Sequence, residues 1–282
     1  MTIAGANNWG TWKKDAGIVG RDEESRLALA VLQAQRHLLL EGPVGVGKTF
    51  LAQCLARYLG RRLYRVDGDE RYSEQKLTGW FDPPMTLKVG YIRDAFRQGP
   101  LVAAMEEGGI LFINELNRMP ESVQNVLLPT LDERLIDIPH LGPLRAQGPF
   151  QVIATQNPQE FVATSHLSEA LKDRFEWVAL DYQSREEEIS IVQGLTGVAD
   201  QGLVHGAVDL ARATRTDARV RRGASVRAAI SIVKIASALG GIDHLEEAAR
   251  VALPTRIQLR EEYQDSTGDL IQELARGEKK NA

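Results

Sequence analysis

The chain has 282 residues, of which 43% are hydrophobic and 26% are charged, and its net charge is −4. These proportions are typical of a globular protein with one large domain or two unequal ones. A negative overall charge does not attract nucleic acid or an anionic membrane, so either partner would need a local basic patch. Cys54 is the only cysteine, which excludes an intrachain disulfide.

The first residues lack the apolar core of a signal peptide. No apolar run approaches the roughly 18 residues that a membrane-spanning helix needs. We therefore expect a cytoplasmic protein with no membrane span.

Short continuous apolar runs predict five strands that are covered by helices on both faces. They are His37–Glu41, Leu63–Asp67, Ile110–Asn114, Gln151–Thr155 and Trp177–Leu180. Helical patterns lie between them, at Asp22–Gln35, Lys48–Tyr58, Ser122–Leu131 and Ser168–Leu171. This alternation predicts an α/β domain built on a five-stranded parallel sheet.

The pattern changes after Tyr182, where only helices are predicted. Ser184 precedes three glutamates, which is typical of a capped helix start. Further helices are expected at Ala224–Leu239, Asp243–Glu262 and Ser266–Ala275. We therefore predict an α/β domain at residues 1–185 and an all-α domain at residues 186–282.

One loop fits the phosphate-binding pattern G-x-x-x-x-G-K-[ST]: Gly42, Pro43, Val44, Gly45, Val46, Gly47, Lys48 and Thr49. Its glycines allow successive N–H groups to point at phosphate oxygens. Lys48 would reach the β- and γ-phosphates, the Thr49 hydroxyl would ligate Mg²⁺, and Phe50 follows directly. A chance glycine-rich turn is the alternative, but a predicted buried strand precedes the loop and a helix follows it. The loop therefore predicts binding of ATP, or a related nucleoside triphosphate, with Mg²⁺.

Two polar residues end the apolar run Ile110–Asn114 and follow it. In P-loop enzymes such a strand delivers a carboxylate toward Mg²⁺. Glu115 would orient the attacking water, and Asn114 stands where an aspartate is expected. The Asn114 amide oxygen still accepts a hydrogen bond from a Mg²⁺-bound water but brings no negative charge. We expect weaker Mg²⁺ affinity and slower hydrolysis as a result.

Six stretches in order resemble the MoxR family of AAA+ ATPases, and within it the branch that contains the CoxD-type maturation factors. They are Val19–Glu24, the phosphate loop, Asn114–Pro120, Val152–Pro158, Glu169–Phe175 and Gly223–Ala228. The resemblance implies a P-loop NTPase core followed by a small all-α lid domain. It also implies that Val19 and Gly20 lie near the adenine.

The resemblance assigns further catalytic roles. Asn157 matches sensor 1, which holds the attacking water, although an Asn-Pro turn is the plain alternative. Arg174 matches the arginine finger that reaches the γ-phosphate of a neighbouring subunit, with a surface ion pair as the alternative. Arg227 matches sensor 2 on a lid helix that Ser225 would cap, with an ordinary surface arginine as the alternative. Arg118 would also act across the subunit boundary.

Two insertions match the family as well, at Thr78–Gly99 and at Arg134–Gly148, where a hairpin is expected. In the family they face the ring pore and the partner, and plain surface loops are the alternative. A basic cluster at Arg215, Arg219, Arg221 and Arg222 has no interleaved aromatic residues, so it is more typical of a solvated loop than of a nucleic-acid site.

The resemblance implies an ATP-driven remodelling enzyme that forms a homo-oligomeric ring, a hexamer, and acts with a partner carrying a von Willebrand factor A (VWA) domain. Its client would be a metalloenzyme that needs maturation or activation. One alternative, favoured by Asn114, is a nucleotide-dependent binding switch with little turnover. Another is a nucleic-acid-associated motor, which the acidic balance disfavours.

Overall fold

The computed structural model describes residues 9–157 and 167–277, so Pro158 of the sensor 1 stretch lies outside the described residues. The chain forms two compact units, one of residues 1–43 and 47–181, the other of residues 44–46 and 182–282. Each has its own hydrophobic core. The main division follows Asp181, close to the predicted domain boundary after residue 185.

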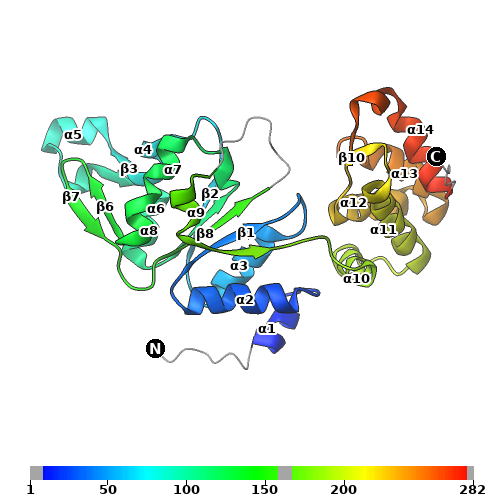
Figure 1. The fold of residues 1–282 in the computed structure, drawn as a ribbon, viewed down its shortest axis with the longest axis horizontal. Helices are drawn as coiled ribbons and strands as arrows, with labels where there is room; N and C mark the ends of the chain where they lie inside the picture. The colour runs from blue at the N-terminus through cyan, green and yellow to red at the C-terminus, as the bar shows by residue number, and fades with distance from the viewer. Residues whose placement is uncertain (1–8, 158–166, 278–282) are drawn as a thin grey trace. The chain divides into compact units, whose positions relative to one another are not determined.

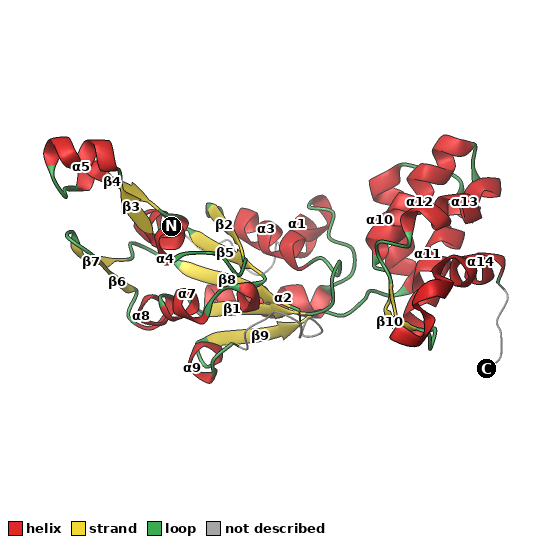
Figure 2. Ribbon diagram, turned by 90° about the horizontal axis from the view of Figure 1, so that it is seen from above, coloured by secondary structure: helices red, strands yellow, loops and turns green. Residues whose placement is uncertain are grey.

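The first unit is built on one five-stranded parallel sheet (Figure 1). Its strand order is β2-β5-β8-β1-β9 (Figure 2). The strands are β1 (His37–Glu41), β2 (Leu63–Asp67), β5 (Ile110–Asn114), β8 (Gln151–Gln156) and β9 (Phe175–Ala179). The three central strands are buried along nearly their whole length. The α/β fold with a parallel sheet is therefore confirmed, and continuous apolar runs were its signal.

The helices of this unit are short and flank the strands. They are α1 (Trp9–Asp15), α2 (Asp22–Gln33), α3 (Lys48–Tyr58), α4 (Glu74–Thr78), α6 (Pro100–Glu107), α7 (Glu121–Asn125), α8 (Leu127–Asp132) and α9 (Glu169–Lys172). The segment predicted as one helix at Ser122–Leu131 is divided into α7 and α8. Pro129 explains the division, because it has no N–H to donate to the Asn125 carbonyl.

The two insertions form antiparallel hairpins at the same end of the first unit (Figure 2). The first pairs β3 (Gly79–Phe81) with β4 (Phe96–Gln98) and carries α5 (Pro83–Val89) and a 3₁₀ turn at Arg93–Ala95 between them. The second is the predicted hairpin, β6 (Leu135–Ile138) with β7 (Gly142–Arg145). Their tips touch, since the Tyr91 and His140 rings stack with centroids 4.1 Å apart.

The second unit is mainly helical. Its helices are α10 (Arg185–Thr196), α11 (Gln201–Thr216), α12 (Val226–Leu239), α13 (Leu245–Ala252) and α14 (Thr267–Arg276), with 3₁₀ turns at Ile242–His244 and Glu261–Ser266. Ser184 and Glu187 form a capping box at the start of α10, which confirms the predicted cap.

One helix prediction in this unit was wrong. The segment Asp243–Glu262 is not one helix, because α13 ends at Ala252 and Pro254 follows. The chain then forms β11 (Gln258–Leu259), which pairs antiparallel with β10 (Val220–Arg222). Strands of two and three residues are too short to show a periodic pattern in the sequence.

No single helix within residues 9–157 and 167–277 has both the length and the apolar character to cross a membrane. The segments Val226–Leu239 and Ile242–Ala252 meet that criterion only when taken together, and the chain bends by 119° between them.

His37 anchors the start of β1 and gives the first unit a pH-dependent stability. Its Nδ1 accepts a hydrogen bond from the Val152 N–H at 3.0 Å, and its Nε2 lies 3.2 Å from the Leu131 carbonyl oxygen. Burial is the main cause that lowers the pKa of His37 to about 4. The folded state therefore stays neutral at pH values where the unfolded chain, with an ordinary pKa near 6.5, takes up a proton.

We predict that the free energy of unfolding is unaffected by His37 above about pH 6.5 and falls by up to about 3 kcal/mol between pH 6.5 and 4. Urea unfolding at several pH values measures this change. His37→Asn keeps an acceptor for the Val152 N–H but cannot titrate, so its stability should fall less over the same range. An equal fall in both proteins would contradict the assignment.

Candidate active site

The loop Gly42–Thr49 leaves the end of β1 and enters α3. Gly45 and Gly47 have φ values of +84° and +95°, the left-handed region that glycine adopts without a steric penalty. The Lys48 ammonium donates to the carbonyl oxygens of Gly42 at 2.6 Å and Pro43 at 2.9 Å. Lys48 is only 9% exposed, so the loop curls around its own lysine at the start of a helix. This backbone suits an anion, because the loop and the helix N-terminus present N–H groups.

A hydrogen-bonded group of residues, here named the strand-end cluster, lies at the carboxyl ends of β2, β5 and β8. It consists of Thr49, Asp67, Asn114, Glu115 and Thr155. The Asn114 Oδ1 accepts from the Thr49 hydroxyl at 3.3 Å and from the Thr155 hydroxyl at 3.1 Å. The Asn114 Nδ2 donates to Asp67 Oδ1 at 3.1 Å. The structure therefore brings Thr49 and Asn114, the two predicted metal-site residues, together.

Glu115 follows in a left-handed conformation with a φ of +57°, which is uncommon for a residue other than glycine. Its N–H donates to the Thr155 hydroxyl at 2.9 Å. Gly68 packs so tightly beside it that a Cβ on Gly68 would lie 2.1 Å from the Glu115 carbonyl oxygen. The Glu115 carboxylate accepts from Arg118 at 3.0 Å, so the structure pairs Arg118 within its own chain. These contacts hold the Glu115 backbone in one place.

Asp67 and Thr155 are the members of the cluster that sequence reasoning missed. Each was treated as the last residue of a predicted strand, and Thr155 also as part of the stretch Val152–Pro158, with no role at the site. The Arg65 guanidinium, 2.7 Å from Asp67 Oδ1, holds the pKa of this carboxyl below its usual range, and Asn114 contributes in the same direction. A signal was available, because an aspartate closes an apolar run next to the run that ends at Asn114.

The oxygen atoms of this cluster are suitable ligands for Mg²⁺. Within the described residues, no group of three or more His, Cys, Asp or Glu side chains could hold a metal ion. Mg²⁺ does not need such a cage, since it binds through a few hard oxygens, phosphates and retained waters. The Thr49 hydroxyl and the Asn114 amide oxygen, with the Asp67 carboxylate behind them, form an oxygen set of this kind.

The other residues predicted for this site lie outside the strand-end cluster. Asn157 follows β8 and is 5% exposed, and because β8 lies between β5 and β1 it ends beside both the cluster and the phosphate loop. Phe50, in the first turn of α3, is 47% exposed. Val19 and Gly20 lie in the turn before α2.

Arg227 belongs to the second unit. It lies in the first turn of α12 and is exposed. Ser225 occupies the N-cap position of this helix but makes no capping hydrogen bond with its side chain, so that prediction was wrong. The Ser225 carbonyl, bonded to the Ala228 N–H at 2.9 Å, closes the first turn instead.

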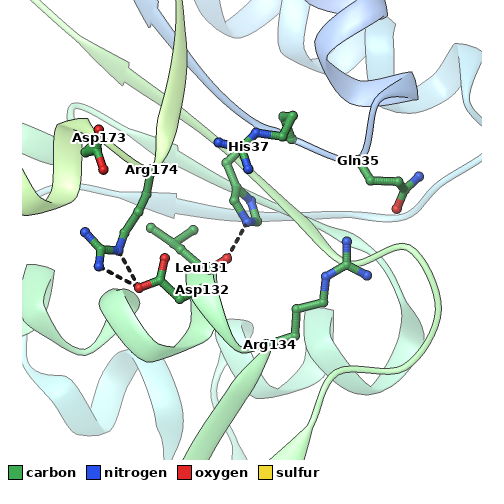
Figure 3. A pocket seen from close by; sticks show the side chains of 8 residues that line it. Gln35, His37, Leu131, Asp132, Arg134, Asp173 and Arg174 are labelled. Atoms are coloured by element: carbon green, nitrogen blue, oxygen red, sulfur yellow. Dashed lines mark hydrogen bonds and ion pairs between the residues drawn. The ribbon is translucent and has the colours of Figure 1, made fainter.

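Arg174 lies at the opposite edge of the sheet. It immediately precedes β9, whose first residue, Phe175, pairs in register with His37 at the start of β1. Its guanidinium forms an ion pair with Asp132, with N–O distances of 2.6 and 2.7 Å (Figure 3). Both line a polar pocket of about 300 Å³ together with Arg36 and Arg134.

Half of the basic cluster of the second unit is paired with acids. Arg215 lies 2.8 Å from the buried Glu188, and Arg219 pairs with Asp217 at 2.9 Å and Glu273 at 2.8 Å. Two of its four arginines are therefore committed to contacts within this unit.

A phosphate loop at the carboxyl end of a parallel sheet, beside an oxygen-rich strand end, defines a P-loop nucleotide-binding protein. The family model described as the AAA domain of the dynein-related subfamily matches residues 37–175. An uncharacterized protein of Staphylococcus epidermidis is 30% identical over 218 residues, which cover 75% of this chain and 82% of that protein. The chain belongs to the AAA+ ATPase family.

One further relative and two solved structures resemble this chain. The gas vesicle ATPase GvpN of Ancylobacter aquaticus is 29% identical over 235 residues, 78% of this chain but only 65% of that protein. A candidate ATPase of Cytophaga hutchinsonii shares the fold with a TM-score of 0.54 at 23% identity, covering 96% of this chain and 94% of the other. The RuvB Holliday junction branch migration motor of Thermotoga maritima gives a TM-score of 0.55 at 20% identity, covering 83% and 70%.

We predict that Gly68→Ala lowers ATP hydrolysis at least tenfold, a loss of about 1.4 kcal/mol in transition-state stabilisation. The added methyl group must displace the Glu115 carbonyl, whereas the phosphate loop is untouched, so ATP affinity should change little. Gly10→Ala is the matched control, because a Cβ there has no atom within 4 Å. Equal hydrolysis by both variants would show that Glu115 does not need this fixed backbone.

Proposed function

We propose that this protein is a Mg²⁺-dependent ATPase that works as a homo-oligomeric ring, in which Arg174 of each subunit completes the site of its neighbour. One observation carries this proposal. The phosphate loop follows the end of β1, whereas Arg174 lies level with the start of β1. Five residues of strand at about 3.3 Å each separate the two edges by roughly 15 Å, so Arg174 is too far from the loop of its own subunit to act there.

Within one subunit, each residue would have a separate task. Lys48 and the loop N–H groups would bind the triphosphate, and Thr49 and Asn114 would hold Mg²⁺, which when bound would neutralise phosphate charge. Glu115 orients and deprotonates the attacking water, with Asn157 beside it on the next strand. Arg118 holds the Glu115 carboxylate in position. Arg227 would close over the nucleotide as sensor 2, and Val19 and Gly20 would contact the adenine.

The work done with this energy would be remodelling of a protein client. The insertions support this idea, because α5 has no buried residue, and Leu87 and Tyr91 are 89% and 55% exposed. Apolar side chains gathered on a protruding element are typical of a protein-binding surface. We propose a MoxR-type chaperone, a hexamer that acts with a VWA-domain partner on a metalloenzyme. The match to a gas vesicle ATPase makes gas vesicle proteins an alternative client.

A nucleic-acid role has less support. The RuvB motor shares only the fold with this chain. Arg215 and Arg219 already form ion pairs within their own unit, which reduces the charge available to phosphates.

To test Arg174 as an arginine finger, we predict that Arg174→Ala binds ATP as the parent does but hydrolyses it about 10³-fold more slowly. The reason is that negative charge on the transferred phosphate is left unpaired in the transition state. Steady-state hydrolysis at a protein concentration that supports the oligomer measures this. Arg36→Ala is the matched control, since Arg36 lines the same pocket and forms an exposed ion pair with Glu176. Lys48→Ala should lose binding, and Glu115→Gln should bind without turnover.

Normal hydrolysis by Arg174→Ala would contradict the finger. If the parent protein binds ATP with Mg²⁺ yet hydrolyses it only at background rate in the presence of its partner, the binding-switch alternative is correct instead.

For remodelling, we predict that Glu115→Gln protein in MgATP co-purifies with the VWA-domain partner or client, and that adding Leu87→Asp removes this capture. ATP binding should remain, because Leu87 is distant in the fold from the phosphate loop. Adding Leu195→Asp, on the exposed face of α10, is the control for loss of an exposed leucine. Equal capture by both double variants would rule out α5 as the contact.

A further inference from the structure

Asn114 leaves this site one negative charge short of the usual strand-end aspartate. A carboxylate is present on the next strand, where it also pairs with Arg65. Asp67 ends β2 directly opposite Asn114 in the parallel register, and the two side chains are hydrogen bonded at 3.1 Å. Sequence reasoning about position 114 alone predicts a weakened metal site, whereas the structure shows a carboxylate one strand away.

The hydrogen bonds fix which end of the Asn114 amide faces the phosphate loop. The amide oxygen can only accept, and it accepts from the Thr49 and Thr155 hydroxyls. The amide nitrogen can only donate, and its acceptor is the Asp67 carboxylate. A carboxylate bound to the N–H end also polarises the amide, which increases the negative charge on its oxygen.

We propose that Asp67 is a positioning residue of the Mg²⁺ site, and that it offsets in part the charge that position 114 lacks, by polarising the Asn114 amide. This inference rests on the proposed function, because it concerns the metal that accompanies the nucleotide. The oxygen of Asn114 is the group that faces Thr49, and Asp67 determines both its direction and its strength as an acceptor.

Neighbouring groups hold Asp67 in this arrangement. Arg65 donates two hydrogen bonds to the carboxylate, from Nη2 to Oδ1 at 2.7 Å and from Nε to Oδ2 at 2.9 Å. The Gly68 N–H donates to the Asn114 carbonyl at 2.7 Å, which continues the β2–β5 pairing one residue past the strands. Asp67 is therefore an ordered carboxylate, although its side chain is 56% exposed. The plainer alternative is that Asp67 serves only as the surface partner of Arg65.

The test is a Mg²⁺ titration at a fixed concentration of a non-hydrolysable ATP analogue, with nucleotide binding as the signal. Asp67→Asn should raise the half-saturating Mg²⁺ concentration about ten- to a hundredfold, the usual loss when a residue behind a metal ligand is changed. Analogue binding without Mg²⁺ and the melting temperature should stay at the parent values. Glu107→Gln is the matched control, because Glu107 is an exposed carboxylate paired with Arg62 beside the opposite end of β2.

A charge exchange separates this role from a structural one. In Asp67→Asn/Asn114→Asp the carboxylate and the amide trade places. The amide introduced at position 67 can still donate to the acid at position 114 and accept from Arg65. We expect the half-saturating Mg²⁺ concentration to return to within about threefold of the parent value, well inside the loss caused by the single change.

Two results with the variants would overturn the inference, and one with the parent protein. One is an Asp67→Asn protein with the same Mg²⁺ dependence as Glu107→Gln, and the other is an exchanged protein as weak as Asp67→Asn alone. A parent protein that binds the analogue but shows no Mg²⁺ dependence would also overturn it. A parent protein that does not bind the analogue at all would contradict the proposed function itself, and this inference with it.

Discussion

All five strands of the central sheet in the first unit point the same way, and this shared direction determines where the charged groups of the site can be. The carboxyl ends of β1, β2, β5 and β8 lie along one edge, so the phosphate loop, Asp67, Asn114 and Asn157 gather there. The amino ends lie along the other edge, where Arg174 sits level with His37. In the proposed ring, each subunit would therefore bind nucleotide at one edge and donate Arg174 to its neighbour from the other.

The carboxyl edge works as a network rather than as a set of independent ligands. Asn114 is held by two hydroxyls and one carboxylate, and Thr155 also takes the N–H of Glu115. Thr155 is buried, and a buried polar group is costly to leave without its partner. A change at any member is therefore expected to affect the metal site and the water-orienting carboxylate together.

Much of this could be predicted from the sequence. Continuous apolar runs marked the five buried strands, and the loop motif marked the phosphate site, because both depend on residues close together in the chain. The helix predicted at Asp243–Glu262 was wrong because helical periodicity was followed past Pro254. Asp67 and Thr155 were missed because their role depends on strand order, which places residues from distant segments side by side. The pairing of Arg118 with Glu115 depends on the left-handed turn at Glu115, and no local sequence pattern predicts that turn.

The central claim is that one active site is assembled from two subunits, and mixing two inactive proteins tests it directly. Lys48→Ala protein retains Arg174 but lacks a working phosphate loop, and Arg174→Ala protein has the loop but lacks the finger. If Arg174 acts on the neighbouring subunit, the mixture should hydrolyse ATP well above the sum of the two proteins measured alone, because some subunit boundaries then carry both residues. If the mixture shows no more than that sum, while the two proteins demonstrably assemble together, the account is contradicted.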